Sequence, residues 1–546
     1  MAANAQNADL NRLADRYFDE YLFHFNPTQA TSAGFHQYDS QLEDYSSAAI
    51  RARVLTLHRF EDAFEKLAAG PDRDLLLSSV RSALLELETI RMWQRNPDLY
   101  SSLASSSAFT IMSRSFAPPA GRLKSLIARE RRMPELLREG RTNVTNPPRI
   151  YVEVAIEQMP GLIGFFEQDV PAAFNAVKDR ALLDEFTNTN RGVIEALQNY
   201  RKYLETDLLP RAHGDFRIGA GNYRKKLLFD EMVDTPLDRL REIGYRNLRE
   251  NQDAFRNTAR LIDPQKTAEQ VMAEVEKDHP APDRILQSFR DVLGGLREFI
   301  EQHKIITIPS PVLPILEETP PFMRALTSAS MDTPGPYETV AKEAFFNVTL
   351  PAKNLTPREV EEFMGSLSRG TILSTAIHEA YPGHYTQFLW IQRIPSKIRK
   401  LLGAGTNIEG WAHYTEQMML DEGFTNDPKM RLGQLRDALL RNARYIVGIE
   451  MHTGEMTMEQ AQQFFIKEGF QTRPTAVQET KRGTSDPTYL MYTLGKLQIM
   501  KLREDYRRLR GSQFSLLEFH NKFMEQGTPP IRIVRRAMLG DDSPVL

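Results

Sequence analysis

Apolar residues recur every three or four positions along most of the chain, with charged residues between them, as in amphipathic helices. Turn residues separate these stretches, for example at Ala69-Gly70-Pro71-Asp72 and Asn146-Pro147-Pro148. The sequence therefore predicts a mainly α-helical protein. The clearest helical stretches are Leu10–Phe25, Ala48–Leu67, Leu75–Trp93, Arg122–Arg138, Ile194–Leu208 and Pro236–Arg260.

The pattern changes between about Lys304 and Leu350, where prolines accumulate and the helical periodicity fades. Two segments here have the composition of strands, Ile305–Ile308 and Ala344–Leu350. We expect a small β-sheet here, with a long connection between lobes as the alternative. The expected division is an N-terminal helical lobe, residues 1–303, and a second lobe, residues 304–546.

Composition excludes several classes of protein and of site. The chain has 546 residues, enough for a large core and more than one lobe. Its 69 basic and 72 acidic residues give a net charge of -3, which argues against a nucleic-acid partner. No apolar stretch approaches the roughly 20 residues that span a bilayer, so we expect no membrane span. Because there is no cysteine, any transition-metal site must use imidazole and carboxylate ligands.

The candidate chemistry begins where Glu379 directly follows His378 and His384 lies six residues beyond that histidine. Zinc hydrolases often pair two histidines one helical turn apart, because positions i and i+4 share a helix face. Six residues place the second ring about 120° away on an unbroken helix. Pro382 and Gly383 lie between them, and we expect a two-residue bulge that restores the common face. The alternative is a helix that ends just before the proline, with unrelated surface histidines.

A third ligand is expected from the next helix, where Glu409, His413 and Glu416 have i, i+4, i+7 spacing and share one face. We prefer Glu409 as the ligand, with His413 or Glu416 holding a ligand side chain by a hydrogen bond. Glu416 as the ligand is the main alternative, and a solvated helix face is another. Two imidazoles and one carboxylate would leave Zn²⁺ one open position, where the pKa of bound water falls to about 7. Glu379 would then act as general base and later as general acid.

Other candidates lie outside these two helices. Tyr492 and Tyr489 are candidate donors to the oxyanion, and buried structural tyrosines are the alternative. Arg482 is a candidate for clamping a substrate carboxylate bidentately, although an ordinary ion pair is an alternative. Asn347 is a candidate substrate-binding residue because Phe345–Leu350 could be an edge strand that pairs with an extended peptide. An ordinary hairpin strand is the alternative for that segment.

Several of these motifs together resemble the bacterial family catalogued as domain of unknown function 885. The Pro-Gly-interrupted histidine motif is the most specific of them, and the opening Pro27–His36 gives further support. The resemblance extends over nearly the whole chain. The other segments that carry it are Glu409–Tyr414, Arg482–Leu490 and Tyr492–Gly495.

The family is grouped with zincin-type metallopeptidases, and the resemblance therefore implies a particular architecture. It implies a two-lobed helical body with a deep channel and zinc at its floor, as in thimet oligopeptidase and angiotensin-converting enzyme. Residues 304–546 would then be the catalytic zinc-binding lobe of one continuous family domain, with the small β-sheet near the active-site channel. Those relatives have a glutamate ligand at a similar distance after the second histidine, which favours Glu409. A narrow channel would restrict substrates to short peptides.

Our hypothesis is a zinc-dependent metallopeptidase, monomeric or homodimeric, that hydrolyses peptide bonds in oligopeptides. One alternative is a zinc amidohydrolase acting on a non-peptide amide or a modified peptide. Another is an inactive protein that retains the metal and binds peptides, although the presence of Glu379 argues against it. The first residues lack the basic end and apolar run of a signal peptide. Many family members carry export signals, so a periplasmic or secreted location stays open.

Overall fold

The computed structural model describes residues 2–320, 323–324, 327–352 and 354–546, and the chain divides into two compact units. Unit 1 comprises Met1–Phe216 with Pro320–Ala325 and Pro334–Glu343, and unit 2 comprises Arg217–Thr319, Leu326–Thr333 and Ala344–Leu546. The predicted lobe boundary at 303/304 therefore falls inside unit 2. It does so because residues 217–302 form helices that pack on the C-terminal helices.

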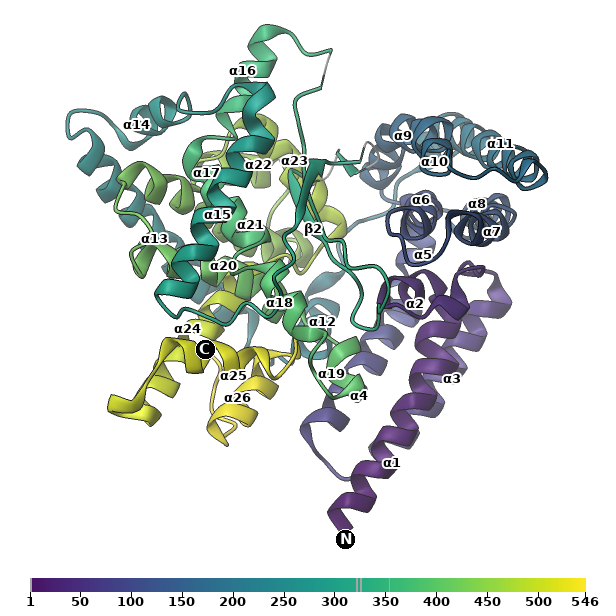
Figure 1. The fold of residues 1–546 in the computed structure, drawn as a ribbon, viewed down its shortest axis with the longest axis horizontal. Helices are drawn as coiled ribbons and strands as arrows, with labels where there is room; N and C mark the ends of the chain where they lie inside the picture. Colours follow the sequence, from purple (N-terminus) through teal and green to yellow (C-terminus); the bar gives the residue numbers. More distant parts are fainter. Residues whose placement is uncertain (1, 321–322, 325–326, 353) are drawn as a thin grey trace. The chain divides into compact units, whose positions relative to one another are not determined.

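Unit 1 is helical, as the periodicity predicted (Figure 1). Four of its helices, α1, α4, α9 and α11, continue into short π-helical segments. The predicted helix Arg122–Arg138 is in fact two helices, because Pro134 begins a new first turn, where its missing N–H costs nothing. The helices are α1 (Ala2–Tyr17), α2 (Pro27–Ala33), α3 (Ser47–Glu65), α4 (Pro71–Leu84), α5 (Met92–Arg95), α6 (Asp98–Met112), α7 (Pro119–Glu130), α8 (Met133–Asn143), α9 (Arg149–Gly164), α10 (Val170–Ala173) and α11 (Arg180–Tyr203).

Unit 2 contains a three-stranded sheet of β1 (Ile315–Glu318), β2 (Ala329–Asp332) and β3 (Phe345–Val348). The order is β1-β3-β2, with β1 parallel and β2 antiparallel to β3. Because β3 is paired on both sides, the prediction that this segment is a peptide-binding edge strand is wrong. Asn347 lies on β3 with a buried side chain, and its Nδ2 donates to Ser330 Oγ at 3.5 Å.

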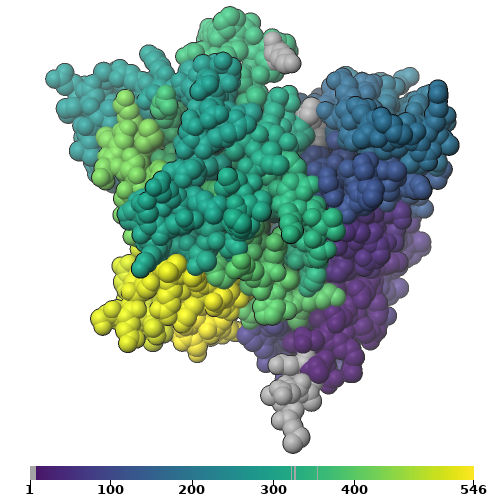
Figure 2. Space-filling model, viewed as in Figure 1, coloured from purple at the N-terminus to yellow at the C-terminus, as the bar shows by residue number. Residues whose placement is uncertain are grey.

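The predicted strand Ile305–Ile308 is not a strand. Its backbone groups bond to side chains of helix α25 (Leu516–Met524) instead of to another strand. His520 Nδ1 donates to the Ile305 carbonyl at 2.8 Å, and the Thr307 amide donates to Asn521 Oδ1 at 3.0 Å. Figure 2 shows the C-terminal segment, in yellow, beside teal surface from this part of unit 2.

Some of the remaining helices of unit 2 pack with their backbones in contact. Glycines allow backbone contact between α20 and α24, since a Cβ on Gly410 would lie 2.5 Å from Gly495 Cα. Among the described helices, none is long and apolar enough to cross a membrane. The helices are α12 (Gly219–Glu231), α13 (Leu237–Ile262), α14 (Ala268–Val275), α15 (Ile285–Gln302), α16 (Pro357–Gly365), α17 (Arg369–Glu379), α18 (His384–Ile391), α19 (Lys397–Leu401), α20 (Gly405–Asp421), α21 (Pro428–Thr453), α22 (Met458–Lys467), α23 (Arg473–Ser485), α24 (Met491–Arg510) and α26 (Ile531–Leu539).

Candidate metal centre

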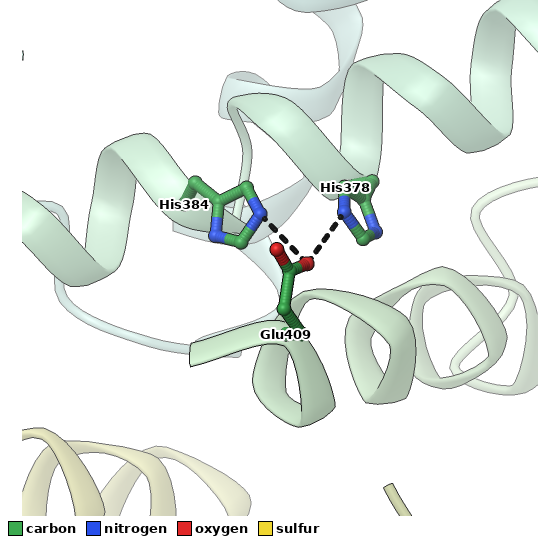
Figure 3. A group of neighbouring side chains, drawn as sticks. All are labelled: His378, His384 and Glu409. Atoms are coloured by element: carbon green, nitrogen blue, oxygen red, sulfur yellow. Dashed lines mark ion pairs between the residues drawn. The ribbon is translucent and has the colours of Figure 1, made fainter. Parts of the chain in front are cut away.

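Three side chains from three helices converge in unit 2 (Figure 3). His378 Nε2, from α17, lies 3.4 Å from Glu409 Oε2, and His384 Nε2, from α18, lies 3.3 Å from the same oxygen. The two imidazole rings are nearly perpendicular, with centroids 4.8 Å apart. One candidate ligand atom from each residue lies within 4.8 Å of the others. The structure therefore brings together the two histidines and the carboxylate that the sequence singled out.

The two imidazoles reach one point because the helix stops and restarts. Helix α17 ends at Glu379, and α18 begins at His384, so the expected bulge inside one continuous helix is wrong. Between them the Gly383 amide donates to the Ile377 carbonyl at 3.0 Å. The indole Nε1 of Trp411 donates to the Pro382 carbonyl at 2.8 Å, which ties this turn to α20. The same helix thus carries Glu409 and fixes the turn that orients the histidines.

Gly383 is required by close backbone approach, because a Cβ there would lie 1.8 Å from the His378 carbonyl oxygen. We expect Gly383→Ala to displace the turn, to lower zinc affinity and to destabilise the fold by about 1–3 kcal/mol. Zinc content and thermal unfolding measure both effects. Gly294→Ala in α15 is the control, since its Cβ would meet nothing within 4 Å. Wild-type zinc content in Gly383→Ala would show that the turn does not position the ligands.

Glu416 lies behind His378 and is fully buried. His378 Nδ1 donates to Glu416 Oε1 at 2.7 Å, and Arg441 Nη2 lies 2.9 Å from the same oxygen. His413 Nδ1 donates to Oε2 at 3.1 Å. Burial opposes the carboxylate charge, but Arg441 and His413 hold the pKa of Glu416 well below its usual range. Glu416 therefore stays ionised and holds the His378 ring with Nε2 facing Glu409, as carboxylates do behind ligand histidines.

Glu409 has the features of a metal ligand. Burial opposes its charge, but His384 and His378 hold the pKa of its carboxyl well below the usual range. Its buried Oε2 accepts no hydrogen bond from any described residue, although both Nε2 atoms lie 3.3–3.4 Å away. Ligand atoms about 2.0–2.1 Å from a tetrahedral zinc ion are about 3.3–3.4 Å apart. Two imidazoles and one carboxylate also form the donor set of many catalytic zinc sites, so these residues fit Zn²⁺.

Glu379 and Tyr492 lie next to these residues. Glu379 is the last residue of α17, and its buried side chain forms no hydrogen bond or ion pair with any described residue. The Tyr492 ring stacks on that of His378, with centroids 6.3 Å apart and planes 23° apart. Tyr492 Oη accepts a hydrogen bond from Arg482 Nη2 at 3.1 Å. Tyr492 and Arg482 therefore lie beside the candidate ligands, and Glu379 adjoins His378 along the chain.

The other two predicted residues, Tyr489 and Asn347, are packed inside the fold. Tyr489 is fully buried between α21 and α23, where a Cβ on Gly483 would lie 2.3 Å from its Oη. Asn347 lies in the middle strand of the sheet. Sequence reasoning also missed Arg441 and Arg444, which stand in an otherwise almost entirely buried helix. Two arginines one turn apart among apolar residues could have indicated a buried charge network, because buried charges need partners.

The chain belongs to the family described as "Bacterial protein of unknown function (DUF885)", which it matches over residues 27–538. A solved structure from Shewanella oneidensis, described as a "putative lipoprotein of unknown function", is 26% identical with a TM-score of 0.79. The match covers 97% of this chain and 99% of that one. A "putative lipoprotein" from Colwellia psychrerythraea is 18% identical with a TM-score of 0.81, covering 97% and 98%, which shows a shared fold. None of the curated proteins matches.

Proposed function

We propose that the chain is a zinc-dependent metallopeptidase that hydrolyses peptide bonds in short peptides. The observation that carries the proposal is the convergence of His378, His384 and Glu409, with one candidate ligand atom from each within 4.8 Å of the others. Both Nε2 atoms lie 3.3–3.4 Å from Glu409 Oε2. Its further support is the buried Glu416, which orients the first imidazole. Glu379 adjoins this histidine in the sequence, where the zinc hydrolase pattern has its general base. The proposal includes membership of the zincin-like clan and an oligopeptide substrate, and the enzyme would be a monomer or a homodimer.

Each residue has a chemical task in this proposal. Zinc, when bound, polarises a carbonyl and acidifies water. Glu379 accepts a proton from the attacking water and returns it to the leaving amine, a task open to a carboxylate without a competing partner. Arg482 donates to Tyr492 Oη, so the phenol hydrogen is free to be donated to the developing oxyanion. Glu416 keeps His378 in the tautomer whose Nε2 can bind metal.

We also propose that the protein works outside the cytoplasm. The similar structures from Shewanella oneidensis and Colwellia psychrerythraea are both described as "putative lipoprotein", which is compatible with that location. Extracytoplasmic peptides would then be its substrates. Fractionation of cells that express the native gene, followed by immunoblotting, tests the location, and a purely cytoplasmic signal would contradict it.

Elemental analysis of the purified protein, combined with a mixed-peptide digest read by mass spectrometry, tests the function. We expect stoichiometric zinc and cleavage of short peptides at defined bonds. Cleavage of non-peptide amides alone would favour an amidohydrolase, and zinc without turnover would favour a peptide-binding protein. Either result would overturn the peptidase proposal.

Removal of the metal has an expected thermodynamic effect. A chelator should abolish hydrolysis and lower the unfolding temperature, because ligand binding stabilises the folded state by about 4 kcal/mol at 1,000 times Kd. Calorimetry before and after zinc is restored measures the effect, and magnesium serves as the control ion. An unfolding temperature indifferent to zinc would mean that no folded-state site binds it.

A further inference from the structure

We propose that Arg482 recognises the free α-carboxylate at the C-terminus of the substrate, so that the enzyme removes residues from the carboxyl end of short peptides. This inference rests on the proposed peptidase function and names its substrate class. The observations that carry it are the arrangement of cations around Tyr492 and the hydrogen-bonding state of each one.

Three guanidinium groups surround the Tyr492 ring. The Cζ atoms of Arg441, Arg444 and Arg482 lie 5.7, 5.0 and 5.8 Å from its centroid. The same ring also stacks on His378, one of the candidate metal ligands. The cationic group is therefore one side chain away from the candidate ligands.

Two of the three charges are already neutralised by buried carboxylates. Arg444 donates to both oxygens of Glu479, at 2.6 and 2.7 Å. Arg441 pairs with the fully buried Glu416 at 2.9 Å. These arginines hold the framework. Arg444 is committed to both oxygens of Glu479, and the Arg441 Nε, which has no hydrogen-bond partner among the described residues, is buried.

Arg482 differs from both. Its carboxylate partner is Asp486, through one contact of 3.2 Å, and the two side chains are 27% and 31% exposed. Nη2 makes this contact and also donates to Tyr492. A bidentate clamp on a substrate carboxylate, as expected from the sequence, would have to use Nη2 and break one of these two contacts. The N–H groups of Nη1 and Nε have no acceptor among the described residues. A carboxylate can accept from Nη1 without breaking any existing bond.

Tyr492 connects Arg482 to the reaction site. Its ring stacks on that of His378, and its Oη accepts from Arg482 Nη2 at 3.1 Å. An α-carboxylate held by Arg482 would place the adjacent peptide bonds near the candidate metal ligands. An internal segment of a long chain offers no such anion, which restricts cleavage to the carboxyl end.

The test compares one short peptide with a free C-terminal carboxylate and the same peptide with a C-terminal amide. For the wild-type enzyme we expect amidation to lower kcat/KM roughly 10- to 100-fold, the value of a hydrogen bond to a charged group. In Arg482→Gln the rates on both peptides should fall, because Arg482 also donates to Tyr492, and the free-acid rate should fall further, so that the ratio of the two rates approaches one. Arg482→Lys should restore part of it. Sequencing of the products should locate every cut near the carboxyl end.

Controls separate recognition from structure and from the proposed function itself. Arg473→Gln removes an exposed charge from the same helix and should keep the full discrimination. Binding of both peptides to zinc-loaded Glu379→Gln, measured by calorimetry, should show the same preference without turnover. Equal wild-type rates on both peptides, or an equal loss on both in Arg482→Gln, would overturn the carboxylate assignment while leaving the peptidase intact. Absence of hydrolysis with a preserved binding preference would instead overturn only the peptidase.

Discussion

Glu379→Gln is expected to retain zinc and to lose hydrolysis by about 10²- to 10⁴-fold, the usual contribution of a general base. Glutamine has nearly the same shape but cannot accept a proton at neutral pH. The fold should survive. Among the described residues the Glu379 carboxylate has no hydrogen-bond or ion-pair partner, so the change leaves no buried group unpaired. Steady-state kinetics on a cleaved peptide, with zinc measured on the same sample, checks both parts. We expect the loss in kcat, with little change in peptide affinity.

The matched control is Glu362→Gln in α16, which removes an exposed carboxylate whose only ion-pair partner in the described part of the chain is exposed Arg358. This control should keep full activity, because exposed pairs contribute little. A Glu379→Gln enzyme within a factor of three of wild type would exclude this residue as the base. Loss of zinc in the same variant would instead show that the carboxylate contributes to the metal site.

The fold class could be predicted because the helical periodicity is local. The two sheet errors come from a different source. Ile305–Ile308 has strand composition, but its backbone is satisfied by His520 and Asn521, more than 200 residues later. Strand order in the sheet is likewise set by long-range pairing, which no local pattern encodes. The segment Ala344–Leu350 was predicted to be extended, and β3 occupies Phe345–Val348 of it; the edge position was wrong.

The candidate ligands could be identified from residue type and spacing, whereas their local geometry could not. A proline and a glycine between two histidines indicate a distorted helix, but the same sequence is compatible with a bulge and with a complete helix break. The choice is made by Trp411, whose indole bonds to Pro382 from another helix. Tyr489 and Tyr492 also look alike in sequence, and only the structure shows that Tyr489 Oη lies against Gly483 whereas Tyr492 Oη accepts from Arg482. The arginines of α21 escaped notice because their acidic partners lie on other helices.

The relative roles of Glu409 and Glu416 give the second large expected effect. Glu409→Gln should reduce zinc affinity by more than the roughly 10- to 100-fold that loss of a carboxylate behind a ligand histidine costs. Glu416→Gln should stay within that range, since an amide oxygen can still accept from His378 Nδ1. Competition with a chelator of known affinity, at constant pH, gives both values. Glutamine is used at both positions because Glu416→Ala would leave Arg441 buried without its anion, a change that costs about 3–5 kcal/mol.

The order of these two affinities separates the two ligand assignments. Glu416 has both oxygens engaged, with His378, His413 and Arg441, whereas Glu409 Oε2 is buried without a hydrogen-bond donor and faces both Nε2 atoms. Glu409 is also the less buried side chain, at 22% exposed, as suits a group that shares its ion with substrate. If Glu416→Gln lost more zinc than Glu409→Gln, the side chains would have to rearrange to bring Glu416 to the metal. His378 would then no longer be oriented by its hydrogen bond to Glu416, and the assignment of Glu379 as the base would have to be reconsidered.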